Sequence, residues 1–328
     1  MGFYVVQFLT GLANAAALFL VASGLSIIFG VTRIVNFVHG SFYMLGAYIG
    51  YTMINAIGGS FAGFWVAILL SALAGGLVGV VVEMTILRRV YQAPELFQLI
   101  ATFGVILVIQ DLSLLTWGSE DLLGPRAPLL KGAVDIGGAL LPTYDIALIA
   151  LSPIVLGGLW LLFNRTRWGI LVRAATQDRE MVGALGVNQV WLFTGVFFLG
   201  SALAALGGAA QLPKGGATLL MDFNILAAVF VVVVVGGMGS IPGAFLAAVL
   251  ISELNSFGIL VWAESTLVLM FVVMAVVLIF RPYGLLGTPE DGSKGEGGPL
   301  EAPYRKAPPK LRLLIGLLTG GHVLLEGV

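Results

Sequence analysis

Long apolar runs separated by short polar segments make up most of the chain. The first run, residues 4–30, holds no charged side chain and is long enough to cross a bilayer. Only helices and closed barrels satisfy their backbone groups in lipid, so even the valine run at residues 231–235 predicts a helix rather than a strand. The pattern predicts an all-α, polytopic helical membrane protein with about nine crossings, eight to nine in all. After the first run, the predicted spans are residues 36–57, 61–87, 97–117, 143–163, 190–212, 223–235, 244–260 and 265–280.

The composition supports this class. Hydrophobic residues make up 59% of the chain and charged residues 10%, with a mean hydropathy of +1.04, whereas soluble domains carry roughly 25% charged residues. A net charge of −1 offers no basic surface for nucleic acid, and the absence of cysteine excludes disulfides and thiol chemistry. Small residues recur four apart, as at Gly75 and Gly79 or at Gly200, Ala204 and Gly208, where we expect close helix packing.

The positively charged loops predict an orientation, because lysine and arginine collect on the cytoplasmic side. Placing the loops that contain Arg88, Arg165 and Arg281 in the cytoplasm puts the N-terminus outside and the C-terminus inside. In this arrangement the only lysine and arginine residues on the extracytoplasmic side are Arg126, Lys131 and Lys214.

The chain changes character after residue 287. Residues 1–287 are predicted to form one transmembrane domain, and residues 288–328 a cytoplasmic tail. The tail is expected to be disordered over residues 288–310, which are rich in proline, glycine and charge. Its final apolar stretch is too short and too broken by glycine to span a bilayer.

One internal polar loop, residues 164–188, concentrates arginine in a chain where charge is scarce. Within it, residues 174–185 predict a short helix that ends at Gly186, and Asn188 is placed to cap the next helix. Met181 and Leu185 are four apart and are expected to share a face with Val182. Such a helix is able to dock a soluble partner or to lie among lipid headgroups, and both interpretations stay open.

Two glycine-flanked interruptions break the apolar runs, at residues 30–40 and 236–243. Broken helices are tolerated in a membrane where their backbone lines a cavity, but each interruption also fits a tight turn between ordinary spans. The glycines concerned are Gly30, Gly40, Gly236, Gly237, Gly239 and Gly243. We expect a translocation pathway near the first interruption, with polar candidates Asn14, Arg33, Asn36, His39, Gln98 and Thr102.

The residues of an enzyme are missing from the sequence. It has only 2 histidines and contains no HExxH motif or phosphate-binding loop, so we predict a transport protein with no metal and no cofactor. An ion-driven carrier usually needs a carboxylate or a histidine in the middle of a span. The carboxylates Glu83, Asp111 and Asp145 lie near predicted span ends, and only Glu253 lies nearer the middle of one, so the pattern counts mildly against ion coupling. An ion-driven secondary transporter and a solute channel remain the alternatives.

Four segments in order resemble the branched-chain amino-acid ABC transporter permeases of the LivH type. They are GLSIIFGVTRIVNFVHGSFYMLGAY at residues 24–48, TRWGILVRAATQDREMVGALGVN at 166–188, VVVVVGGMGSIPGAFLAAVLI at 231–251 and RPYGLLG at 281–287. The resemblance implies a multi-pass permease core in the cell inner membrane, and the ATPase on another chain explains the missing phosphate-binding loop. The tail beyond residue 287 departs from the pattern of the family.

The resemblance also implies partners. These are a second permease of the LivM type, two cytoplasmic ATPase subunits and an extracytoplasmic substrate-binding protein. The polar loop then becomes a coupling helix seated in an ATPase groove, with the residues Arg173, Gln177, Asp178, Met181, Val182, Leu185 and Gly186. The cargo stays open among aliphatic amino acids, amides, urea and aromatic acids.

Overall fold

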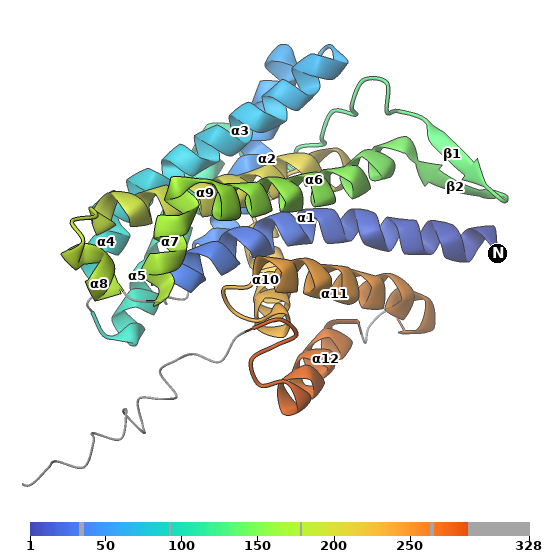
Figure 1. Ribbon diagram of the computed structural model, residues 1–328. Helices are drawn as coiled ribbons and strands as arrows, with labels where there is room; N and C mark the ends of the chain where they lie inside the picture. The colour runs from blue at the N-terminus through green and yellow to red at the C-terminus, as the bar shows by residue number, and fades with distance from the viewer. Residues whose placement is uncertain (33–35, 92, 178, 263–265, 288–328) are drawn as a thin grey trace, which may run out of the picture. The chain divides into compact units, whose positions relative to one another are not determined.

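The computed structural model describes residues 1–32, 36–91, 93–177, 179–262 and 266–287 (Figure 1). The described part is mostly helical, with one short hairpin of two antiparallel strands, β1 and β2. Arg33, Asp178 and the predicted tail lie outside the described residues. The elements are α1 (Gly2–Thr32), α2 (His39–Ile57), α3 (Phe61–Val82), a π-helical turn (Glu83–Leu87), α4 (Arg88–Val90), α5 (Glu95–Trp117), β1 (Ala133–Ile136), β2 (Ala139–Pro142), α6 (Thr143–Arg165), α7 (Arg167–Gln177), α8 (Arg179–Ala184), α9 (Gln189–Gly215), α10 (Met221–Gly236), α11 (Ile241–Trp262) and α12 (Thr266–Phe280).

Six helices in this part of the chain are long and apolar enough to cross a membrane: α1, α3 with its extension to Val90, α5, α6, α9 and α11. The apolar helices α10 and α12 are shorter. The helical membrane class predicted from the sequence is therefore supported, while nine crossings and the orientation stay predictions.

The core is built around α1 and α9. In Figure 1, α1 runs along the bundle, and α9 packs against α1, α2 and α3. Glycine makes these contacts close: a Cβ at Gly46 would collide with the backbone of Ala205, and one at Gly208 with the backbone of Tyr43. Small residues on facing helices bring the backbones together, as the spacing predicted.

The described residues on either side of the first interruption belong to two helices that lie against each other. The helix α1 continues through Gly30 to Thr32, and α2 begins at His39, beside the middle of α1 rather than its end. The contact that fixes this position joins His39 Nε2 to the Val21 carbonyl oxygen at 2.8 Å. The helix α10 in turn begins against the first turn of α2, where a Cβ at Gly40 would collide with the backbone of Asp222. The N-terminal ends of α2 and α10 therefore meet inside the bundle.

The second interruption is a tight turn, so the simpler of the two interpretations holds there. The helix α10 ends at Gly236 and α11 begins at Ile241, and Gly237 and Gly239 between them have positive φ angles of 99° and 83°. Side chains with a Cβ resist that conformation. The segment after α12 closes the end of α10, because the backbone N–H of Leu285 donates to the Val235 carbonyl at 2.7 Å and that of Leu286 to Gly236 at 3.1 Å.

Candidate translocation pathway and coupling surface

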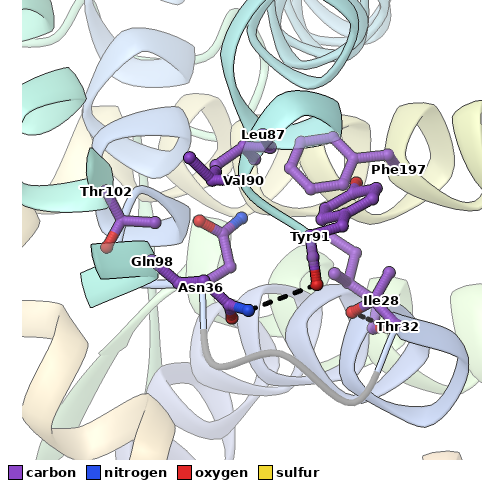
Figure 2. A pocket seen from close by; sticks show the side chains of 9 residues that line it. All are labelled: Ile28, Thr32, Asn36, Leu87, Val90, Tyr91, Gln98, Thr102 and Phe197. Carbon is purple, nitrogen blue, oxygen red and sulfur yellow. Dashed lines mark hydrogen bonds between the residues drawn. The ribbon is translucent and has the colours of Figure 1, made fainter. Parts of the chain in front are cut away.

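Three of the predicted pathway residues come together around one cavity. Asn36, Gln98 and Thr102 line it from the segment before α2 and from α5 (Figure 2). Its volume of about 10 Å³ is close to the room that one water molecule needs. The rest of the lining is Ile28, Thr32, Leu87, Val90, Tyr91 and Phe197.

The polar groups at this cavity are held in different ways. The Nε2 group of Gln98 donates to the carbonyl oxygens of Tyr91 at 3.3 Å and Ala93 at 2.8 Å. Asn36 is 2% exposed, and its Oδ1 accepts from the Val38 backbone N–H at 3.1 Å. Its Nδ2 has no hydrogen-bond partner among the described residues. A buried amide donor left in this way costs free energy unless something binds to it.

The other pathway candidates do not line the cavity. Asn14 is exposed and accepts a hydrogen bond from Lys214 at 2.9 Å, and Lys214 also pairs with Asp145 at 3.0 Å. His39 is fully buried, and because a carbonyl only accepts, its Nε2 carries the proton in the bond to Val21. That arrangement is the packed, hydrogen-bonded histidine expected of a lone histidine in an apolar helix.

The sequence analysis missed an aromatic cluster that contains the residues following Asn36 and Asp222 in the chain. Phe37 follows Asn36, and its ring centroid lies 5.4 Å from that of Phe103 and 5.1 Å from that of Phe230. The ring of Phe103 in turn lies 6.5 Å from that of Phe223, which follows Asp222. These rings come from three separate segments of the chain, so no local pattern could reveal their contact.

A buried ion pair joins the end of α3 to the first turns of α9. Arg88 donates to both oxygens of Glu83, at 3.1 and 2.8 Å, and to Thr194 Oγ at 2.7 Å. Thr194 itself donates to Glu83 at 3.0 Å. Glu83 is 1% exposed and opens the π-helical turn whose last residue, Leu87, lines the cavity. The sequence placed Glu83 only near the end of a span.

The polar loop is helical over a longer stretch than predicted. The prediction that its helix starts at residue 174 was wrong, because α7 already begins at Arg167; α8 then runs to Ala184, and Asp178 between the two is not described. The end is confirmed: Gly186 has a positive φ of 81°, and Asn188 Oδ1 accepts from the N–H groups of Val190 and Trp191. The early start follows from Thr166, whose Oγ accepts from the Gly169 N–H at 3.1 Å.

The apolar residues of α8 and the turn after it divide between two faces, which corrects the single predicted face. Val182 is 5% exposed and packs into the core, whereas Met181 is 59% and Leu185 76% exposed. Arg173 on α7 donates to Asn164 at 2.6 Å, which ties α7 to the end of α6. The helices α7 and α8 therefore form an arm anchored on the bundle, with Met181 and Leu185 on its surface. The side chain of Gln177 is outside the described atoms.

The comparisons with known proteins point to one family. The family model described as "Branched-chain amino acid transport system / permease component" matches residues 7–278. The chain is 29% identical over 298 residues to the high-affinity branched-chain amino acid transport system permease protein BraD of Pseudomonas aeruginosa, covering 88% of this chain and 97% of BraD. It is 28% identical over 305 residues to the permease protein LivH of Escherichia coli K12, with the same coverage.

A second kind of permease also matches. The permease protein LivM of Salmonella typhimurium is 24% identical over 294 residues, which cover 80% of this chain and 66% of LivM. No solved structure matches the chain. With more than four fifths of its length inside the family model, the chain belongs to the family of permease components of branched-chain amino acid transport systems, and it is a transport subunit rather than an enzyme.

Proposed function

We propose that this chain is the membrane-spanning subunit of an ATP-binding-cassette importer for branched-chain or related small amino acids. The relatives BraD and LivH are named for that cargo, and the chain covers almost their whole length. The observation that carries the proposal is the pairing of two features in one bundle. One is a helix interruption lined by polar groups, and the other is an anchored arm with exposed apolar residues.

The proposed pathway follows the bundle-facing side of α5. Gln98 and Thr102 lie four residues apart on this face, with Asn36 across the cavity. The aromatic cluster of Phe37, Phe103, Phe223 and Phe230 would close the pathway next to Asn36. A cavity the size of one water molecule is too small for an amino acid, so transport requires the walls to separate.

The proposed drive comes from the arm. An ATPase that seats Met181 and Leu185 would move α7 and α8, and Asn188 connects that movement directly to α9. The first turns of α9 hold Thr194, which bonds Glu83 and Arg88, and the π-helical turn between those two ends at the cavity wall. A short chain of contacts therefore links the arm to the pathway, as a two-state change of access needs.

The proposed assembly has the chain in the cell inner membrane with nine crossings, its N-terminus outside and its C-terminus inside. Its partners would be a LivM-type permease, two ATPases and a substrate-binding protein. The match to LivM supports a related second permease. Arg88 and Arg89 in α4 and Arg167 and Arg173 in α7 support the cytoplasmic side for the arm.

Reconstitution tests the proposal against the ion-driven carrier and the channel. The complete complex in proteoliposomes should take up leucine only when ATP is supplied on the side of the membrane that the ATPases face. The substrate-binding protein must also be present on the opposite side. Uptake by this chain alone, driven by an ion gradient or by diffusion, would refute the proposal.

A further inference from the structure

The carboxylate of Asp222 is held by several hydrogen bonds in the interior of the bundle. It is 2% exposed, and neutral donors from three segments hold it. Gln110 on α5 donates to both oxygens at 3.0 Å, Ser41 on α2 donates to Oδ2 at 3.2 Å, and the Phe223 N–H donates to Oδ1 at 2.8 Å. The carboxylate therefore has a fixed orientation.

No cation accompanies this carboxylate in the described part of the chain. The ion pairs there join Arg88 to Glu83 and Lys214 to Asp145, and neither involves Asp222. Buried carboxylates are normally matched by a cation or a metal. Here the positive ends of α2 and α10, which meet at this point, stabilise the charge only in part. The carboxyl group is thus buried, preorganised and, within the described ranges, without a counter-ion.

A second buried polar group lies on the same face of α2. The Tyr48 hydroxyl, seven residues from Ser41, has no hydrogen-bond partner in the part of the chain that the structure describes. The Tyr48 ring centroid lies 5.2 Å from that of Trp117, and the Trp117 indole N–H donates to Thr52 at 2.8 Å. Polar groups therefore continue from Asp222 along α2 and α5 as far as Thr52 and Trp117.

The wall beside Asp222 is lightly packed. The helix α5 contacts the bundle mainly through α2, α4 and the π-helical turn, and only 28% of its apolar window is buried. Outward movement of α5 would carry Gln110 with it and open Asp222 to the line of polar groups around Tyr48.

We propose that Asp222, presented by Gln110 and Ser41 where α2 and α10 begin, is the contact for the ammonium group of the cargo. The inference rests on the proposed import function and narrows its cargo to compounds that carry an ammonium group, namely amino acids. Urea, amides and aromatic acids without an ammonium group gain nothing from a lone carboxylate. The Tyr48 hydroxyl is a second group available to the same cargo.

Charge-selective thiol labelling tests this inference, because the chain has no native cysteine. In the assembled importer carrying Ser41→Cys, the rates of reaction with an ammonium-bearing and a sulfonate-bearing methanethiosulfonate are compared. Taking their ratio cancels any change in thiol reactivity. Asp222→Asn should lower the ratio of cation to anion rate by about tenfold or more. The control Glu253→Gln removes another carboxylate within the helices, one that has no hydrogen-bond partner among the described residues, and should leave the ratio unchanged.

Protection by cargo gives a second measurement that needs no change at Asp222. Leucine should slow the labelling of Ser41→Cys, whereas 4-methylpentanoate and 4-methylpentanamide should not. Equal ratios in Asp222→Asn and Glu253→Gln, equal protection by all three compounds, or no labelling in any nucleotide state would each overturn the inference. ATP-driven leucine uptake that persists alongside such a result would leave the import function standing and remove only the site.

Discussion

The imidazole Nε2 of His39 donates to the carbonyl oxygen of Val21 over 2.8 Å, which attaches the first residue of α2 to the middle of α1. The helix α2 therefore begins alongside α1, and not beyond its end. Asn36 and Phe37 lie in the described end of that segment, next to the cavity and in the aromatic cluster. Because this bond uses Nε2 to hold α2 against α1, we interpret His39 as a residue that packs the two helices together.

Cysteine substitutions at Asn36 and His39 should therefore behave differently. In the assembled importer, we expect Asn36→Cys to react with a small polar thiol reagent at a rate that ATP or cargo changes by severalfold. His39→Cys should stay unlabelled, because residue 39 faces Val21 of α1 and does not line the cavity. Equal labelling of the two positions in all states would contradict the pathway proposed here.

Arg88→Gln should destabilise the protein by removing the cation from buried Glu83. We expect a loss on the order of 2–3 kcal/mol, less than the roughly 3–5 kcal/mol of a fully buried pair, because the Arg88 side chain is 33% exposed. A lower midpoint of thermal unfolding in detergent, at a fixed scan rate, would report it.

The double variant Glu83→Gln with Arg88→Gln is the control for that experiment. It removes both charges, so it should recover most of the loss. A double variant no more stable than Arg88→Gln alone would show that the pair does not act as a unit.

Met181→Asp combined with Leu185→Asp should uncouple ATP hydrolysis from uptake. An apolar side chain buried in an interface contributes about 1.5–3 kcal/mol, and a buried charge adds a further penalty. Both side chains are exposed, so the bundle itself should fold normally. Co-purification of the ATPases and leucine uptake are the measurements.

The matched variant Met181→Leu with Leu185→Met keeps the apolar surface and volume, and it should transport normally. Full uptake and normal ATPase recovery with the two aspartates would exclude these residues from the docking surface.

Two truncations should separate the tail from the segment that closes α10. A stop after Glu290 removes most of the tail and should leave assembly and uptake intact, because no predicted span lies beyond residue 287. A stop after Pro282 also removes Leu285 and Leu286, whose N–H groups bond the end of α10, and should lower the thermal midpoint. Failure of the protein that stops after Glu290 to assemble would assign the tail a task that the sequence does not reveal.

The sequence by itself determined the features that depend on neighbours along the chain. Apolar runs of bilayer length require helices, since lipid offers the backbone no hydrogen bonds. The ends of helices followed from local chemistry, as at Gly186 with its positive φ and at Asn188 with its accepting side chain. The grouping of Asn36 with Gln98 and Thr102 was expected from their polarity, but no local pattern indicates that they face one another across a cavity.

Only the tertiary structure decided the rotation and depth of each helix. In a membrane protein, the side chains that face lipid and those that face the core are both apolar, so a sequence pattern does not mark which face turns inward. For that reason Val182 was predicted to share an exposed face with Met181, although its side chain packs into the bundle. The hydrogen bond between Glu83 and Thr194 was not expected either. The meeting of α2 and α10 at Asp222 depends on residues about 180 positions apart, which only close packing of glycine brings together.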